Sequence, residues 1–187
     1  PRPGEVGHET WENDAWRWSG DISTWAPASA DPELGLVYMV TNASTVQFYA
    51  GHRPGNNLFG GSVLALDVKT GERRWHYQIH RSDQWNYDLP TPPMLMDLTI
   101  NGQSIPALIQ NTKQGLVFAF NRETGEPIWP IEDREVFQTQ VPGNFTRCPR
   151  TPRSGTGGSS SSQQSACSAF CWPGSRAWAW VVWSVCR

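Results

Sequence analysis

The chain has 187 residues, a formal net charge of −2 and a charged fraction of 17%. This length allows one modest domain, or one domain with an appendage, and the small net charge gives no electrostatic reason to expect nucleic acid or an acidic membrane as a partner. The 17 glycines, 15 prolines and 11 tryptophans predict many short strands and tight turns in place of long helices. The apolar run at residues 177–182 is far too short to cross a membrane.

The predicted strands begin with an apolar run at residues 36–41, which leads into a long polar and glycine-rich loop at 41–61. Loops of that length in a compact domain are usually functional or disordered. Farther along, residues 94–96 and 105–110 flank Asn101-Gly102, a dipeptide typical of a tight β-hairpin. Few segments before residue 147 show helical patterning, so the expected fold class is all-β.

An internal repeat is the clearest signal in the chain. Residues 65–72 (Ala-Leu-Asp-Val-Lys-Thr-Gly-Glu) lead to Trp75, and residues 119–126 (Ala-Phe-Asn-Arg-Glu-Thr-Gly-Glu) lead to Trp129, at an offset of 54 residues. Each copy indicates a β-hairpin, and the offset suits one propeller blade with a generous loop. Two unrelated hairpins that share common turn chemistry are the alternative, which the fixed register of the tryptophan disfavours. We therefore predict that Trp75 and Trp129 occupy equivalent places in successive blades.

The composition changes sharply at Arg147, which divides an expected domain at residues 1–146 from a tail at residues 147–187. All 17 acidic residues and all four histidines precede Arg147, whereas all four cysteines follow it. This change, with Ser/Gly/Gln low complexity at 154–165, predicts a frameshifted and disordered tail that packs poorly on the sheets. The alternative is a cysteine-based metal or disulfide module, but the Cys167-x₃-Cys171 spacing is a weak zinc signal without a nearby histidine.

Several separated motifs in the first 146 residues resemble, in their order and spacing, the pyrroloquinoline-quinone (PQQ)-dependent alcohol and glucose dehydrogenases, and the membrane glucose dehydrogenases in particular. Those enzymes are eight-bladed propellers, so the resemblance implies a partial β-propeller of two to three blades, a fragment of the whole. Trp75 and Trp129 would then be structural residues that dock one blade on the next. The motifs that carry the resemblance are residues 23–27, 31–38, 52–59, 64–78, 83–90, 112–115 and 122–127.

The resemblance implies that three residues hold the cofactor and its metal. Trp25 matches the position whose indole lies beneath the quinone, where a rigid aromatic face stacks a flat cofactor; the alternative is a core tryptophan. Lys113 matches the cation beside the quinone oxygens, which stabilises the negative charge that develops there; the alternative is a solvated loop lysine. Asn42 matches an amide ligand of Ca²⁺, a cation that prefers oxygen donors; the alternative is a turn asparagine.

The catalytic position departs from the family pattern at Asn86. Many family members have an aspartate here, which takes the proton of the substrate hydroxyl, and an amide has no titratable carboxylate to do so. Asp88 would face the same side as residue 86 on a regular strand, so it is the candidate replacement base, unless it caps the turn at residues 89–90. Asp83 is a third, lower-ranked candidate, and residues 80–82 (His-Arg-Ser) replace the family's usual paired histidines.

The resemblance also implies a function for the parent protein. It would oxidise an alcohol or sugar hydroxyl with PQQ as hydride acceptor and Ca²⁺ as metal, work in the periplasm, and pass electrons to a quinone or a cytochrome. The chain alone is expected to be inactive, because it holds only part of the propeller. The competing interpretation is a non-catalytic β-propeller that serves as a scaffold for protein interactions. A scaffold has no need to cluster Trp25, Lys113 and Asp88 in one place, which distinguishes the two.

Overall fold

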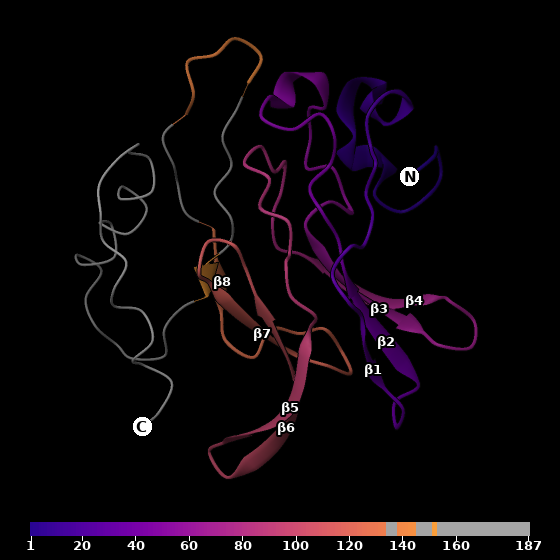
Figure 1. The fold of residues 1–187 in the computed structure, drawn as a ribbon, viewed down its shortest axis with the longest axis vertical. Coiled ribbons are helices and arrows are strands. Elements are labelled where there is room, and N and C mark those ends of the chain that lie inside the picture. The colour runs from indigo at the N-terminus through magenta and orange to yellow at the C-terminus, as the bar shows by residue number, and fades with distance from the viewer. Residues whose placement is uncertain (134–137, 145–150, 153–187) are drawn as a thin grey trace, which may run out of the picture. The chain divides into compact units, whose positions relative to one another are not determined.

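The computed structural model describes residues 1–133, 138–144 and 151–152 (Figure 1). Contacts group residues 1–154 into one compact unit, and the architecture below is that of this unit. All but two residues of the predicted tail at 147–187 lie outside the described residues, so its disorder, frameshift origin and lack of a metal site stay predictions. Within the described part of the chain, no helix is long and apolar enough to span a membrane.

The first sheet contains four antiparallel strands in the order β1-β2-β3-β4 (Figure 1). These are β1 (Ser29–Asp31), β2 (Leu36–Val40), β3 (Ser62–Asp67) and β4 (Arg73–Gln78). Strand β2 alternates buried and half-buried residues along its length, as expected of a strand with one face in the core. The apolar run predicted as a strand at 36–41 is therefore confirmed.

The second sheet has the order β5-β6-β7 and repeats the antiparallel pattern of the first. Its strands are β5 (Met94–Ile100), β6 (Gln103–Asn111) and β7 (Val117–Asn121). The predicted hairpin between β5 and β6 is confirmed: Asn101 and Gly102 both have positive φ, of 52° and 79°, as a two-residue hairpin turn requires.

The remaining described elements are short. Strand β8 (Ile131–Glu132) pairs with β9 (Thr151–Pro152). Three 3₁₀ segments, η1 (His8–Thr10), η2 (Glu12–Arg17) and η3 (Ala50–His52), are the helical elements among the described residues. The all-β prediction is thus confirmed, and the long loop predicted at 41–61 contains only η3.

The turns of the two repeats, at residues 67–71 and 121–125, make the same set of hydrogen bonds. The Asp67 side chain accepts from the backbone amides of residues 69 and 70, and the Asn121 side chain accepts from those of residues 123 and 124. The Gly71 amide donates to the Asp67 carbonyl and the Gly125 amide to the Asn121 carbonyl, each at 2.8 Å. Asp and Asn close such turns with their side chains, and glycine supplies the positive φ that follows. The internal repeat is therefore a structural repeat.

Trp75 and Trp129 follow these turns at the same distance, as predicted, but their surroundings differ. Trp75 lies in β4 with 8% of its surface exposed, and its indole donates to the Arg122 carbonyl at 3.0 Å. Trp129 lies just beyond the single bridge between Phe120 and Pro127, outside a regular strand, and is 39% exposed. The difference arises because the second repeat covers Trp75, whereas no described residues provide Trp129 with the same cover.

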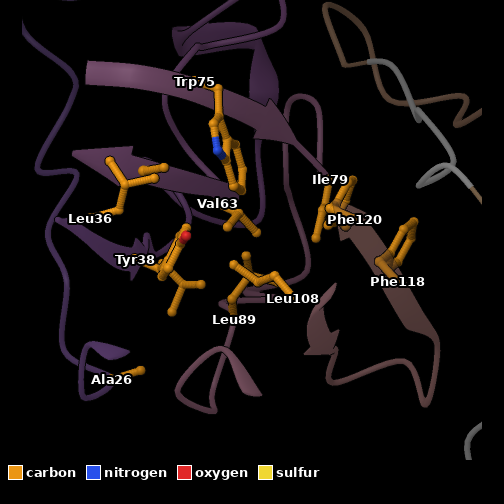
Figure 2. Close-up of a cluster of buried hydrophobic side chains, with 12 residues drawn as sticks. Ala26, Leu36, Tyr38, Val63, Trp75, Ile79, Leu89, Leu108, Phe118 and Phe120 are labelled. Carbon is orange, nitrogen blue, oxygen red and sulfur yellow. The ribbon is translucent and has the colours of Figure 1, made fainter. Parts of the chain in front are cut away.

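The hydrophobic core lies where the two sheets meet. Figure 2 shows side chains from the first sheet, such as Tyr38 and Val63, facing Phe118 and Phe120 of β7. Burial of one such large apolar side chain contributes about 1.5–3 kcal/mol. The core consists of Ala26, Leu36, Tyr38, Val40, Val63, Ala65, Trp75, Ile79, Leu89, Leu108, Phe118 and Phe120.

Arg122 adds a polar link between the sheets. Its guanidinium pairs with Asp31 and Asp97, each at 2.7 Å, and its carbonyl accepts the Tyr38 hydroxyl at 2.9 Å. Burial raises the pKa of Asp31, but the hydrogen bonds from Leu34 and Arg122 outweigh it and hold that pKa below its usual range. Burial also raises the pKa of Tyr38 to about 12, so its hydroxyl stays a neutral donor. This link fixes β1, β2, β5 and β7 against one another.

Candidate functional site

Three loops far apart in the sequence bring the candidate site together. One precedes β1 and carries Trp25, one follows β4 and carries residues 83–90, and one joins β6 to β7 and carries Lys113. The third is a tight turn in which the Gly115 amide donates to the Thr112 carbonyl at 3.0 Å, with Gly115 at φ 75°. This turn projects Lys113 away from the sheet and toward the other two loops.

The Lys113 ammonium joins all three loops. Its Nζ donates to the Asn86 carbonyl at 2.9 Å and to Asp88 Oδ2 at 3.2 Å. The same Nζ lies 5.8 Å from the centre of the Trp25 ring, within the range of a cation–π contact. We predicted that Trp25, Lys113 and Asp88 face one shared cleft, and the structure brings the three together around the Lys113 ammonium.

Trp25 is not a core tryptophan, since 54% of its surface is exposed. A large indole held by its loop with one face near an ammonium and much of its surface open is suited to stack against a flat partner. Lys113 is likewise not a freely solvated loop lysine, because its side chain is 33% exposed and has named partners. The cofactor roles of both residues stay predictions, and their geometry is consistent with those roles.

Asp88 is 8% exposed, and both of its carboxylate oxygens are occupied. Oδ1 accepts the Ala43 amide at 2.7 Å, and Oδ2 accepts the Lys113 ammonium. Residues 83–90 do not form a strand, and Asn86 has φ 57°, so the expectation that Asp88 shares a strand face with residue 86 is wrong. The Asp88 carboxylate accepts from Ala43 and Lys113 and not from the turn at 89–90, so the capping alternative is not supported either.

Asn86 and Asp83 have different places in the same loop. The Asn86 carbonyl binds Lys113, whereas its side-chain Oδ1 is buried without a hydrogen-bond partner. A buried polar atom of this kind is usually satisfied by water or by a ligand. Asp83 accepts the amides of Trp85 at 2.8 Å and Tyr87 at 2.7 Å, so its carboxylate closes the loop on itself.

Asn42, the predicted calcium ligand, fastens another loop. Its Oδ1 accepts the Ser23 amide at 2.6 Å, its backbone amide donates to the Ser23 carbonyl at 3.1 Å, and its Nδ2 donates to the Asp21 carbonyl at 3.2 Å. Three bonds to this segment hold the chain that leads to Trp25. The part of the chain that the structure describes contains no group of three or more His, Cys, Asp or Glu residues able to hold a metal ion. The metal role of Asn42 therefore stays a prediction.

Sequence reasoning assigned no role to the pair formed by His80 and Gln114. His80 is 3% exposed, and its Nε2 lies 2.6 Å from Gln114 Oε1, next to Lys113 in the β6–β7 turn. Burial lowers the pKa of His80, and the nearby Asp83 carboxylate opposes that shift only in part. The imidazole is consequently neutral at pH 7. The available signal in the sequence was the position of His80, two residues after the strand that carries Trp75.

We expect the free energy of unfolding to fall as the pH drops below about 6.5, by at most about 1.4 kcal/mol per pH unit for each histidine. The sign follows because the unfolded chain takes up a proton near its usual pKa of 6.5, whereas burial keeps His80 neutral until lower pH. His76 contributes in the same direction, since burial and then Arg73 lower its pKa. Urea unfolding between pH 7 and pH 5.5 measures this dependence. The free energy of unfolding should fall less steeply with decreasing pH in His80→Gln than in the parent chain. Equal pH dependence in the two would contradict a buried, neutral His80.

Comparison with known proteins places these two sheets in a known architecture. The model of the "PQQ: Glucose/ethanol/alcohol dehydrogenase, beta-propeller domain" family matches residues 1–166. The glycerol dehydrogenase large subunit of Gluconobacter oxydans (strain 621H) is 39% identical over 153 residues, which are 81% of this chain and 20% of that protein. The quinoprotein glucose dehydrogenase of Escherichia coli (strain K12) is 36% identical over 124 residues, 66% of this chain and 16% of that protein.

Solved structures agree with these matches. The quinohemoprotein alcohol dehydrogenase from Comamonas testosteroni superposes with a TM-score of 0.63 at 26% identity, over 79% of this chain and 22% of that chain. A europium-containing methanol dehydrogenase gives a TM-score of 0.60 at 31% identity, over 70% of this chain and 23% of that chain.

The two sheets are successive blades of a partial β-propeller, as the repeat predicted. The chain spans about a fifth of the length of the curated relatives described above. With the family model matching residues 1–166 and the motifs in the expected order, this chain belongs to the PQQ-dependent glucose/ethanol/alcohol dehydrogenase β-propeller family.

Proposed function

We propose that this chain forms part of the PQQ-binding wall of a dehydrogenase that oxidises an alcohol or sugar hydroxyl. The observation that carries the proposal is the Lys113 ammonium, which lies 5.8 Å from the exposed ring of Trp25 and bonds to the Asn86 carbonyl and to Asp88. PQQ is flat and anionic, so an open indole face beside a fixed cation is complementary to it in both shape and charge. The buried, unpartnered Oδ1 of Asn86 is a further polar group at this place.

Each residue has a separate part in the proposal. When bound, PQQ supplies the acceptor for the hydride that leaves the substrate carbon. Trp25 orients the flat ring system, and Lys113 holds positive charge where negative charge develops, an effect that is strong because the donor is fixed in advance. Asn86 cannot accept the hydroxyl proton. Asp88 is the carboxylate in contact with this group and keeps the role of candidate base, since each of its oxygens has a lone pair beyond the one that accepts from Ala43 or Lys113.

The proposal extends to calcium, to the electron acceptor and to the compartment. A calcium ion would need ligands in addition to Asn42, whose side-chain oxygen accepts the Ser23 amide. A quinone or a cytochrome as electron acceptor, and the periplasm as compartment, follow from the family resemblance alone. Because the chain spans only about a fifth of the length of its relatives, we expect no turnover from it without the rest of a propeller.

The scaffold alternative lacks a specific observation in its favour. A propeller used only for protein interactions does not need an exposed tryptophan, an ammonium and a carboxylate joined at one point. Their contact through Lys113 favours a cofactor site. The clustering therefore supports the dehydrogenase proposal over the scaffold.

Equilibrium dialysis of the chain against PQQ, read by PQQ absorbance, tests the proposal. Trp25→Ala removes the stacking face and Lys113→Met removes the cation, and each variant should weaken PQQ binding about tenfold or more. Trp18→Ala is the matched control, because Trp18 is a 60% exposed tryptophan whose indole binds the His52 carbonyl, not the Lys113 group. Equal PQQ affinity in Trp25→Ala, Trp18→Ala and the parent chain would refute the assignment.

A further inference from the structure

Arg53 is a fully buried arginine, with 0% of its surface exposed. Its guanidinium donates to three acceptors: Nε to the Val46 carbonyl at 2.9 Å, Nη1 to Asn57 Oδ1 at 2.7 Å, and Nη2 to the Asp83 carbonyl. Burying a charge costs free energy unless hydrogen bonds replace its hydration. The three hydrogen bonds of Arg53 therefore offset the cost of burying its charge.

Those bonds reach the candidate site through Asp83. Arg53 holds the Asp83 carbonyl, and the Asp83 carboxylate holds the amides of Trp85 and Tyr87. These two amides lie immediately before and after Asn86. Arg53 and Asp83 thus hold the backbone on both sides of Asn86, the residue whose carbonyl accepts from the Lys113 ammonium.

The same loop has two further backbone bonds to the segment that carries Arg53. The Phe48 amide donates to the Gln84 carbonyl, and the Ser82 amide donates to the Asn56 carbonyl, each at 3.1 Å. Ser82 and Asn86 both adopt positive φ, of 49° and 57°. Positive φ is unfavourable for a non-glycine residue such as Ser82 unless surrounding contacts fix it, whereas asparagine tolerates it better. An irregular loop of this kind needs an anchor, because it has no strand ladder.

We propose that Arg53 is a positioning residue for the candidate cofactor site: through Asp83 it fixes the backbone around Asn86 and so places the carbonyl that receives Lys113. Arginine suits this task, since its planar fork offers several donors in fixed directions, whereas a lysine ammonium is a single flexible point. The consequence for PQQ rests on the proposed function. The anchoring of the loop does not.

The first arm of the test is amide hydrogen exchange on the unmodified chain. The amides of Trp85 and Tyr87 lie outside any strand, yet they should exchange at least about a hundredfold more slowly than in an unstructured peptide. Exchange at the unstructured rate would overturn the proposal without any variant having to fold.

The second arm compares Arg53→Lys with Arg53→Met. A residue that merely fills space is replaced as well by methionine as by lysine, and an apolar substitute for a buried charge often preserves or raises overall stability. A positioning residue predicts that protection of the Trp85 and Tyr87 amides falls about tenfold in Arg53→Lys and further in Arg53→Met. Equal or better protection with methionine would overturn the proposal.

Tyr38→Phe is the matched control. It removes another buried hydrogen bond, from the Tyr38 hydroxyl to the Arg122 carbonyl, and should leave the Trp85 and Tyr87 amides as protected as before. PQQ dialysis then separates the two proposals. Loss of PQQ affinity in Arg53→Lys but not in Tyr38→Phe supports both. Failure of the parent chain to bind PQQ refutes the proposed function, while the exchange data still decide the role of Arg53.

Discussion

Replacing Gly125 by alanine is expected to lower the free energy of unfolding by about 2–5 kcal/mol, the sum of backbone strain and overpacking. Gly125 has φ +79°, and a Cβ added there would lie 2.6 Å from Cδ2 of the Trp75 ring. Trp75 cannot give way easily, because it is 8% exposed and its indole donates to the Arg122 carbonyl. Urea unfolding of the chain measures this loss.

Gly71→Ala provides the matched control. Gly71 holds the equivalent place in the first repeat at φ +73°, but no atom lies within 4 Å of its added Cβ. Only the left-handed strain applies there, which costs about 1–2 kcal/mol. Equal losses in the two variants would mean that the contact between Trp75 and Gly125 does not join the blades. If Gly125→Ala loses more stability than Gly71→Ala, the difference in unfolding free energy between the two variants measures the overpacking against Trp75.

Asp88→Asn is expected to lower the free energy of unfolding by about 1–3 kcal/mol, because it removes a charged acceptor from a largely buried ion pair. Asparagine keeps an oxygen for the Ala43 amide, but its neutral amide no longer compensates the Lys113 ammonium. The pair is partly screened, with the Asp88 and Lys113 side chains 11% and 33% exposed. Thermal or urea unfolding of the single variants and of Asp88→Asn/Lys113→Met gives the coupling energy directly.

The control for this cycle is Asp97→Asn, which removes a carboxylate that is 63% exposed and also pairs with an arginine, Arg122. An exposed partner of this kind should cost only about 0–1 kcal/mol. Zero coupling between Asp88 and Lys113 would contradict the ion pair. PQQ dialysis adds a second distinction: if Asp88 places Lys113, Asp88→Asn weakens PQQ binding, whereas a carboxylate needed only as a base leaves that binding unchanged.

Local chemistry explains which features could be predicted from the sequence. The turns at Gly71 and Gly125, the hairpin at Asn101-Gly102 and the alternation in β2 depend on residues within a few positions of one another. Such patterns appear directly in the sequence, so the all-β class and the repeat were predictable. Trp25 and Lys113 were singled out by their motifs, and the structure brings them into contact.

Only the tertiary structure decided the environment of each side chain. Nothing in the sequence around Arg53 indicates a fully buried guanidinium, because its three acceptors come from residues 46, 57 and 83. The contacts of Asp88 likewise depend on Ala43 and Lys113, which are 45 and 25 residues away. The sequence by itself determined the strands, their turns and the blade repeat, since these follow from periodicity and turn geometry. Packing between distant segments decided which carboxylates are exposed or paired and which loop is anchored. The physical reason is that burial and hydrogen-bond partners exist only once those segments meet.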